Sequence, residues 1–197
     1  MSGSRRQRPA DWDAQAPGFD EAADHGLQDP RVRSAWRDLL LGVLPAAPAR
    51  VADLGCGTGT LSLLLADGGY DVDGVDFSAE MVRLARGKAG DRAGVGFVVA
   101  DAGEPPLPPA SYDVVLCRHV LWALPDPATA LERWVDLLAP GGSLVLVEGD
   151  WHTGAGLTAT RTAELLTAAG RVPRVRHLPD PALWGREIED ERYLVVA

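Results

Sequence analysis

A glycine-rich turn contains the residues of this sequence that are best suited to bind a ligand. Gly55, Gly57 and Gly59 follow an apolar stretch predicted to be a strand and precede a predicted helix. Glycine lets the backbone turn sharply and approach a ligand closely, and the start of a helix offers free N–H groups with partial positive charge. Asp76 ends the next predicted strand, about 20 positions after Gly55, where folds of this type place a carboxylate against ribose hydroxyls. The spacing therefore predicts a site for a nucleotide-derived cofactor.

The spacing of the glycines also narrows the choice of cofactor. A dinucleotide-binding turn has the pattern Gly-x-Gly-x-x-Gly, whereas Thr60 stands here at the position of the third glycine. This disfavours an NAD-dependent oxidoreductase, which is kept as an alternative together with a non-catalytic nucleotide-binding protein of the same fold. A glycine-rich connector followed by an unrelated surface aspartate is the alternative without a ligand.

Residues 53–59 resemble the first motif of the class I S-adenosylmethionine-dependent methyltransferases of the small bacterial type, and the resemblance extends over residues 19–197. It implies S-adenosyl-L-methionine as the cofactor, with the glycines beneath its methionine part. It also implies that Asp53 holds the amino group, Asp76 the ribose and Asp101 the adenine amino group. The residues expected to contact the cofactor are Asp53, Gly55, Gly57, Gly59, Asp76, Phe77, Met81, Asp101, Ala102 and Arg118.

The loops after the fourth and fifth predicted strands are candidates for an acceptor pocket, because such sheets bind ligands outside the carboxyl ends of their strands. His119 could act as a general base, since the pKa of an unperturbed imidazole is near neutrality, and a structural hydrogen bond is the alternative. Trp122 could pack against the acceptor or face the cationic sulfonium. The other candidates for this pocket are His25, Glu148, Trp151 and His152.

The activity implied by the resemblance is methyl transfer to a small-molecule acceptor. The sulfonium of the cofactor already activates the methyl group, so the protein mainly has to align a nucleophile in line with the sulfur–carbon bond. This in-line displacement produces the methylated acceptor and S-adenosylhomocysteine. A general base is needed only where the acceptor atom still carries a proton.

Short apolar stretches alternate with helical patterns along the chain, which is typical of βαβ units. The pattern predicts an α/β fold: a doubly wound, Rossmann-like, seven-stranded and mostly parallel sheet with helices on both faces. The resemblance adds the strand order 3-2-1-4-5-7-6, with the last strand antiparallel. Helices are expected to begin after the capping residues Asp29, Ser78 and Asp126, and a further helix is expected over residues 158–169. The predicted strands cover residues 51–54, 71–76, 95–100, 112–117, 143–148, 172–178 and 192–196, and residues 140–142 are expected to stop the helix before the fifth.

The chain divides into an N-terminal leader or lid over residues 1–28 and a methyltransferase domain over residues 29–197. The leader mixes aromatic and polar residues, and in the methyltransferases that it resembles such a segment folds over the cofactor. A poorly ordered leader is the alternative. Arg5, Arg6 and Arg8 form a basic cluster that we interpret as a solvated end.

Composition limits the class of protein further. A chain of 197 residues with 46% hydrophobic content suits one domain, and no stretch approaches the roughly 18 apolar residues of a membrane span. The net charge of -9 disfavours binding to a phosphate backbone, so we expect a small-molecule acceptor and neither a nucleic-acid nor a membrane partner. Cys56 and Cys117 have no metal-type spacing, so we predict no metal site, no disulfide framework and a cytoplasmic protein.

Overall fold

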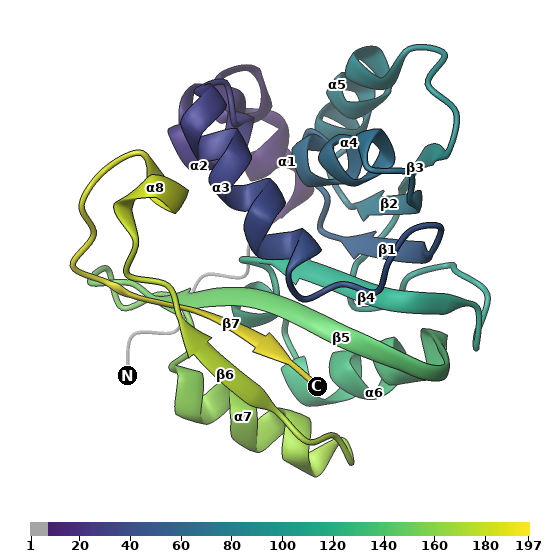
Figure 1. Ribbon diagram of the computed structural model, residues 1–197, viewed down its shortest axis with the longest axis vertical. Coiled ribbons are helices and arrows are strands. Elements are labelled where there is room, and N and C mark those ends of the chain that lie inside the picture. The colour runs from purple at the N-terminus through teal and green to yellow at the C-terminus, as the bar shows by residue number, and fades with distance from the viewer. Residues whose placement is uncertain (1–7) are drawn as a thin grey trace.

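The computed structural model describes residues 8–197 and contains a seven-stranded sheet in the order β3-β2-β1-β4-β5-β7-β6. Neighbouring strands from β3 to β5 are parallel, whereas β7 is antiparallel to both β5 and β6. The predicted fold class, strand order and antiparallel last strand are therefore confirmed (Figure 1). The strands are β1 (Arg50–Leu54), β2 (Asp71–Asp76), β3 (Val95–Val99), β4 (Tyr112–Arg118), β5 (Leu138–Asp150), β6 (Arg174–His177) and β7 (Glu191–Val196).

Helices cover both faces of the sheet, as Figure 1 shows. One face carries α3 (Pro30–Leu41), α4 (Thr60–Asp67) and α5 (Ala79–Ala89), and the other carries α6 (Pro127–Leu137) and α7 (Ala159–Ala168). Along β4, Val114 and Leu116 pack into the core on the first face, and Val115 and Cys117 pack into the core on the second. Successive side chains of a strand point to opposite faces, so a strand covered on both sides is apolar throughout.

The predicted helix starts are confirmed by capping hydrogen bonds. The side chains of Asp29, Ser78 and Asp126 each accept a backbone N–H from the first turn of the following helix, at 2.7, 3.1 and 3.1 Å. Thr158 caps α7 in the same way, at 3.1 Å. Such caps satisfy N–H groups that have no partner inside the helix.

Two strands, β5 and β6, differ from their predicted bounds by more than one residue. β5 begins at Leu138, directly after the end of α6, so residues 140–142 lie inside the strand and do not stop the helix. The pairing of β4 with β5 is irregular there, because the register shifts between Tyr112 and Val114. β6 is shorter than predicted, and Val172 lies outside it with an exposed side chain.

Several short helices were not predicted: α1 (Pro9–Asp13), the 3-10 helix η1 (Ala16–Glu21), α2 (Ala23–Gly26), the 3-10 helix η2 (Leu121–Ala123) and α8 (Pro181–Trp184). They are too short to show a hydrophobic repeat, and distant contacts hold them. In α8, the Trp184 indole N–H donates to the Leu178 carbonyl at 2.9 Å, and the Trp36 indole N–H donates to the Leu183 carbonyl at 2.6 Å. At the other end of the chain, α1 contacts α5, and α2 contacts α8. Arg5 and Arg6 lie outside the described residues.

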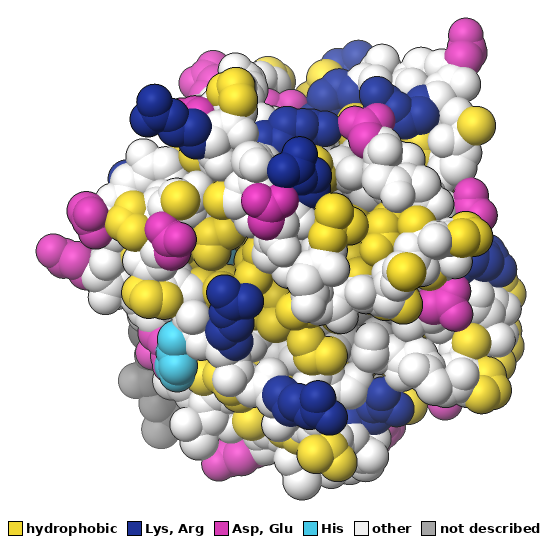
Figure 2. All heavy atoms as spheres, in the orientation of Figure 1, with side chains coloured by type: hydrophobic (Ala, Val, Ile, Leu, Met, Phe, Trp, Pro, Cys, Tyr) yellow, Lys and Arg dark blue, Asp and Glu magenta, His cyan; other side chains and the backbone are white. Residues whose placement is uncertain are grey.

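The surface is mixed in character. On the face shown in Figure 2, basic and acidic side chains are interspersed with hydrophobic ones. None of the helices within residues 8–197 is both long enough and apolar enough to cross a membrane. Cys56 and Cys117 are both free thiols, and burial raises the pKa of each.

Candidate functional site

A cavity of about 650 Å³ lies where β1, β2 and β4 end, beneath the N-terminal helices. This volume is in the range of small-molecule sites. Most of the residues predicted for the cofactor line it: Asp53, Gly55, Gly57, Asp76, Phe77, Met81, Asp101, Ala102 and Arg118. The same cavity is lined by four residues predicted for the acceptor side: His25, His119, Trp122 and Trp151.

The glycine turn is held open by its backbone conformation. Gly55, Gly57 and Gly59 all have positive φ angles, of 76°, 54° and 76°, in the region that side chains disfavour. A Cβ atom on Gly55 would lie 2.2 Å from the Val120 side chain. Gly59 does not line the cavity, because it caps α4 and packs tightly against Phe97. Gly55 and Gly57 are thus the two glycines that offer bare backbone to a ligand.

Asp76 joins the end of β2 to the glycine turn. One of its carboxylate oxygens accepts the Gly57 N–H at 2.9 Å, and the other accepts the Ser78 N–H at 2.9 Å. The side chain is buried, and burial raises its pKa against the effect of these two hydrogen bonds. The carboxylate therefore closes the turn as well as facing the cavity.

Asp53 and Arg118 place opposite charges at the inner end of the cavity. Asp53 is buried and accepts the Ser62 hydroxyl, and burial raises its pKa to about 6. Arg118 donates to the backbone carbonyl of Asp24 and lies over the Trp36 ring, 5.0 Å from its centroid. Burial lowers the pKa of Arg118, and the nearby Asp24, Asp53 and Asp20 act in the opposite sense. A ligand with both an amino and a carboxylate group would find complementary partners here.

His119 follows β4 in an unusual backbone conformation. Its φ angle is 60°, and its N–H donates to the Val147 carbonyl at 2.9 Å. Within residues 8–197, the ring nitrogen Nε2 is buried without a hydrogen-bond partner. Burial lowers the pKa of His119 well below its usual value, and the charge of Arg118 adds to this effect. The imidazole is therefore neutral near pH 7.

Glu148 and His152 lie outside the cavity, contrary to the prediction that they form its wall. Glu148 is fully buried behind the loop after β4, where its Oε1 accepts the N–H groups of Val120 and Leu121 at 3.0 and 2.8 Å. Burial raises its pKa to about 8. His152 points outward, with 83% of its side chain exposed, and its ring pairs with Asp190 at 2.9 Å. The sequence predicted that this strand ends at residue 148, whereas β5 continues to Asp150. Glu148 therefore lies inside the strand, and the predicted strand end gave no information on the direction in which either side chain points.

The N-terminal segment forms one side of the cavity through Trp12, Phe19 and His25. The residues that attach this segment to the rest of the domain belong to no recognisable sequence motif. Asp13 accepts the Ser78 hydroxyl at 2.6 Å, and Asp20 pairs with Lys88 at 2.7 Å. These pairs join residues more than sixty positions apart, so no local spacing could have predicted them.

The sheet order, the glycine turn and the carboxylate at the end of β2 define an α/β protein that binds a nucleoside cofactor at the carboxyl edge of its sheet. Residues 52–146 match the family model described as a methyltransferase domain. The chain therefore belongs to the class I S-adenosylmethionine-dependent methyltransferases, and S-adenosylmethionine is the cofactor of this family.

Comparison with individual proteins supports this membership. Over 138 residues, the chain is 38% identical to trans-aconitate 2-methyltransferase from Streptomyces avermitilis, covering 66% of this chain and 51% of that protein. The chain spans about half the length of such curated relatives. The putative methyltransferase solved with the Haloferax volcanii Trm112 activator has the same fold, with a TM-score of 0.74, 23% identity and 98% of each chain covered. An S-adenosylmethionine-dependent methyltransferase from Mesorhizobium loti has a TM-score of 0.66, 22% identity and coverage of 83% of this chain and 98% of that one.

Proposed function

We propose that this protein transfers a methyl group from S-adenosylmethionine to a small-molecule acceptor. The proposal depends chiefly on one observation: a single cavity is lined by the glycine turn, by two buried aspartates and by several aromatic side chains. Its volume of about 650 Å³ is large enough for a cofactor and a small acceptor. The matched Streptomyces protein is named for methylation of trans-aconitate, which is a small molecule.

The residues at the cofactor end fit this ligand. Gly55 and Gly57 bring bare backbone to the cavity, and Asp53 offers a buried carboxylate for an ammonium group. Asp76 can accept ribose hydroxyls, and Asp101 can accept from an exocyclic amine. When it is bound, the cofactor supplies a methyl group already activated by its positively charged sulfur. The remaining task of the protein is to position an acceptor and to exclude water.

The acceptor end is formed by Trp122, Trp151 and His119. The two indoles lie 5.5 Å apart and tilted, and the His119 ring meets Trp151 edge-on at 5.1 Å. Such an apolar wall excludes water and favours the in-line approach of a nucleophile. The N-terminal segment from residue 8 to residue 27 serves as the cover of this chamber, because Trp12, Phe19 and His25 all line the cavity.

Calorimetry with S-adenosylmethionine, S-adenosylhomocysteine and NAD tests the proposal. We expect the first two to bind with one molecule per chain and NAD not to bind, because the glycine turn lacks the dinucleotide spacing. Binding of NAD alone would favour the oxidoreductase alternative. Binding of the methionine cofactor without methylation of any acceptor in a panel of small hydroxy and carboxylic acids would favour a non-catalytic protein of the same fold.

Cofactor affinity should decrease in acid because of Asp53. The pKa of Asp53 is raised to about 6, and the cofactor's ammonium group requires the ionised carboxylate. Below about pH 6, binding must first remove a proton, so the Kd rises by up to roughly tenfold per pH unit. Arg118 and Asp76, the charged groups that influence Asp53, act in opposite directions. Calorimetric Kd values between about pH 5 and pH 7 measure this, and Asp53→Asn should bind more weakly with a shallower profile, because burial also raises the pKa of the remaining Asp76. An equal slope in that variant would contradict the assignment.

A further inference from the structure

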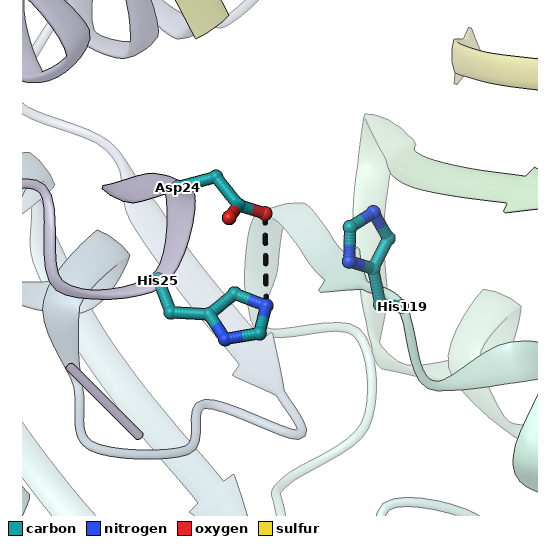
Figure 3. Close-up of side chains that lie close together, drawn as sticks. All are labelled: Asp24, His25 and His119. Atoms are coloured by element: carbon teal, nitrogen blue, oxygen red, sulfur yellow. Dashed lines mark ion pairs between the residues drawn. The ribbon is translucent and has the colours of Figure 1, made fainter. Parts of the chain in front are cut away.

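Two neighbouring side chains of the N-terminal segment, Asp24 and His25, meet His119 from the loop after β4, and the two histidines line the acceptor end of the cavity. One ligand-type atom from each of Asp24, His25 and His119 lies within 4.8 Å of the other two. Figure 3 shows the Asp24 carboxylate beside the His25 ring, with the His119 ring across a gap from both. The distance from Asp24 Oδ2 to His25 Nε2 is 3.6 Å, which is too long for a good hydrogen bond. The three groups thus face one another around a small space.

We propose that Asp24, His25 and His119 bind a divalent transition-metal ion of the Zn²⁺ type. An ion at their centre would lie roughly 2–3 Å from each ligand atom, and small side-chain rotations bring these distances to the usual Zn–N and Zn–O values of about 2.0–2.2 Å. Two imidazoles and one carboxylate suit Zn²⁺, Co²⁺ or Ni²⁺, whereas Mg²⁺ and Ca²⁺ prefer oxygen ligands.

Both histidine rings are held in place by neighbouring side chains. The His25 ring stacks on Phe19 at 4.3 Å and forms a hydrogen bond with the Phe19 backbone. A second hydrogen bond of this kind orients a metal-bound imidazole. The His119 ring is held between Trp151, edge-on at 5.1 Å, and Trp184, stacked at 6.0 Å. Its buried Nε2 has no hydrogen-bond partner among the described residues.

The charges near the site set the expected affinity. Arg118 donates to the backbone carbonyl of Asp24, so its positive charge opposes a cation. Asp20 and Asp53 also act on Arg118 and provide negative charge in the same region. We therefore expect micromolar binding, weaker than that of a closed structural zinc site.

The function of this ion rests on the proposed methyl transfer. Three protein ligands would leave further coordination positions for an acceptor atom, and His25 and His119 line the same cavity as the two tryptophans of the acceptor end. A hydroxyl or carboxyl oxygen of the acceptor that binds there loses its proton to solvent more easily. The new oxygen–carbon bond then forms as the sulfur–carbon bond breaks, and the products are a methyl ether or ester and S-adenosylhomocysteine. The site therefore selects an oxygen acceptor.

The test uses Co²⁺ and Zn²⁺ added to the cofactor-free, tag-free protein. We expect one Co²⁺ per chain with visible absorption bands, and one Zn²⁺ per chain by calorimetry. His25→Gln, His119→Gln and Asp24→Asn should each weaken binding by at least about tenfold. His177→Gln is the matched control, because His177 pairs with Glu191 on an exposed strand. Thermal unfolding checks that each variant is folded.

Two results would overturn the metal site. One is that the wild-type protein binds neither Co²⁺ nor Zn²⁺ at millimolar concentration. The other is that the His25→Gln and His119→Gln variants bind these ions as tightly as the wild type does. The proposed function has a separate readout, because S-adenosylmethionine binding is measured without metal. Cofactor binding without metal binding removes only the site. Metal binding without cofactor binding would contradict the proposed methyl transfer and would support the metal site.

Discussion

The Asp76→Ala variant is expected to bind S-adenosylmethionine roughly 10- to 150-fold more weakly than the wild type, a loss of about 1.5–3 kcal/mol. Asp76 contributes in two ways. Its carboxylate is placed to accept ribose hydroxyls, and it holds the glycine turn through the Gly57 and Ser78 N–H groups at 2.9 Å. Alanine removes the ligand contact and leaves both N–H groups without their acceptor. Calorimetric Kd values measure the effect.

Two further variants separate these contributions. Asp76→Asn keeps one acceptor oxygen, so one of the two N–H groups stays paired while the charge is lost, and its loss of affinity should be smaller than that of Asp76→Ala. Asp71→Ala is the matched control, because Asp71 is an exposed residue at the start of the same strand. A wild-type Kd in Asp76→Ala would show that the ribose lies elsewhere, whatever the effect of the variant on thermal unfolding.

Removal of the Glu148 carboxyl should have the largest effect on stability. Near pH 6, Glu148→Ala is expected to lower the free energy of unfolding by about 2–5 kcal/mol, because two buried N–H groups lose their acceptor. These belong to Val120 and Leu121, in the loop that carries His119. Urea denaturation measures the loss. Glu164→Ala, at an exposed helical position paired with Arg161, should change stability little.

The pH dependence of stability identifies Glu148 independently. Its pKa is raised from 4.5 to about 8 in the folded protein, so the folded state holds a proton that the unfolded state has already lost. The free energy of unfolding therefore falls as pH rises toward 8, by up to about 1.4 kcal/mol per pH unit. Asp53, with a pKa of about 6, has stopped contributing by pH 7. Glu148→Gln cannot titrate, so its stability should be nearly flat between about pH 7 and pH 8. An unchanged slope there would contradict the buried, protonated carboxyl.

The cofactor end of the site could be predicted well from sequence, because its features are local. Glycines at 55 and 57, with an aspartate at the end of the next strand, have a spacing set by strand–turn–helix geometry. Capping residues such as Ser78 likewise act within a few positions of themselves. The same reasoning placed Gly59 beside the ligand, whereas the packing of α4 turned it toward Phe97.

The acceptor end was harder to predict, because direction as well as position matters there. Glu148 lies inside β5 and is buried beneath the loop after β4, whereas Trp151 follows β5 and lines the cavity. The end of β5 depends on its pairing with β7, which is formed by residues more than forty positions later. The alternation of residues along a strand predicts which side chains share a face of the sheet. It does not predict where the pairing with the neighbouring strand ends.

Sequence alone thus determined the class of fold, the glycine turn and the carboxylate opposite it, since each follows from backbone geometry over a few neighbouring residues. Tertiary structure alone decided that Asp24 and His25 meet His119, which lies 94 positions after His25. It also decided how the N-terminal segment is attached beside the cavity, through pairs such as Asp13 with Ser78 and Asp20 with Lys88. Contacts between distant segments arise from the packing of the whole domain, and no local pattern of residues records them.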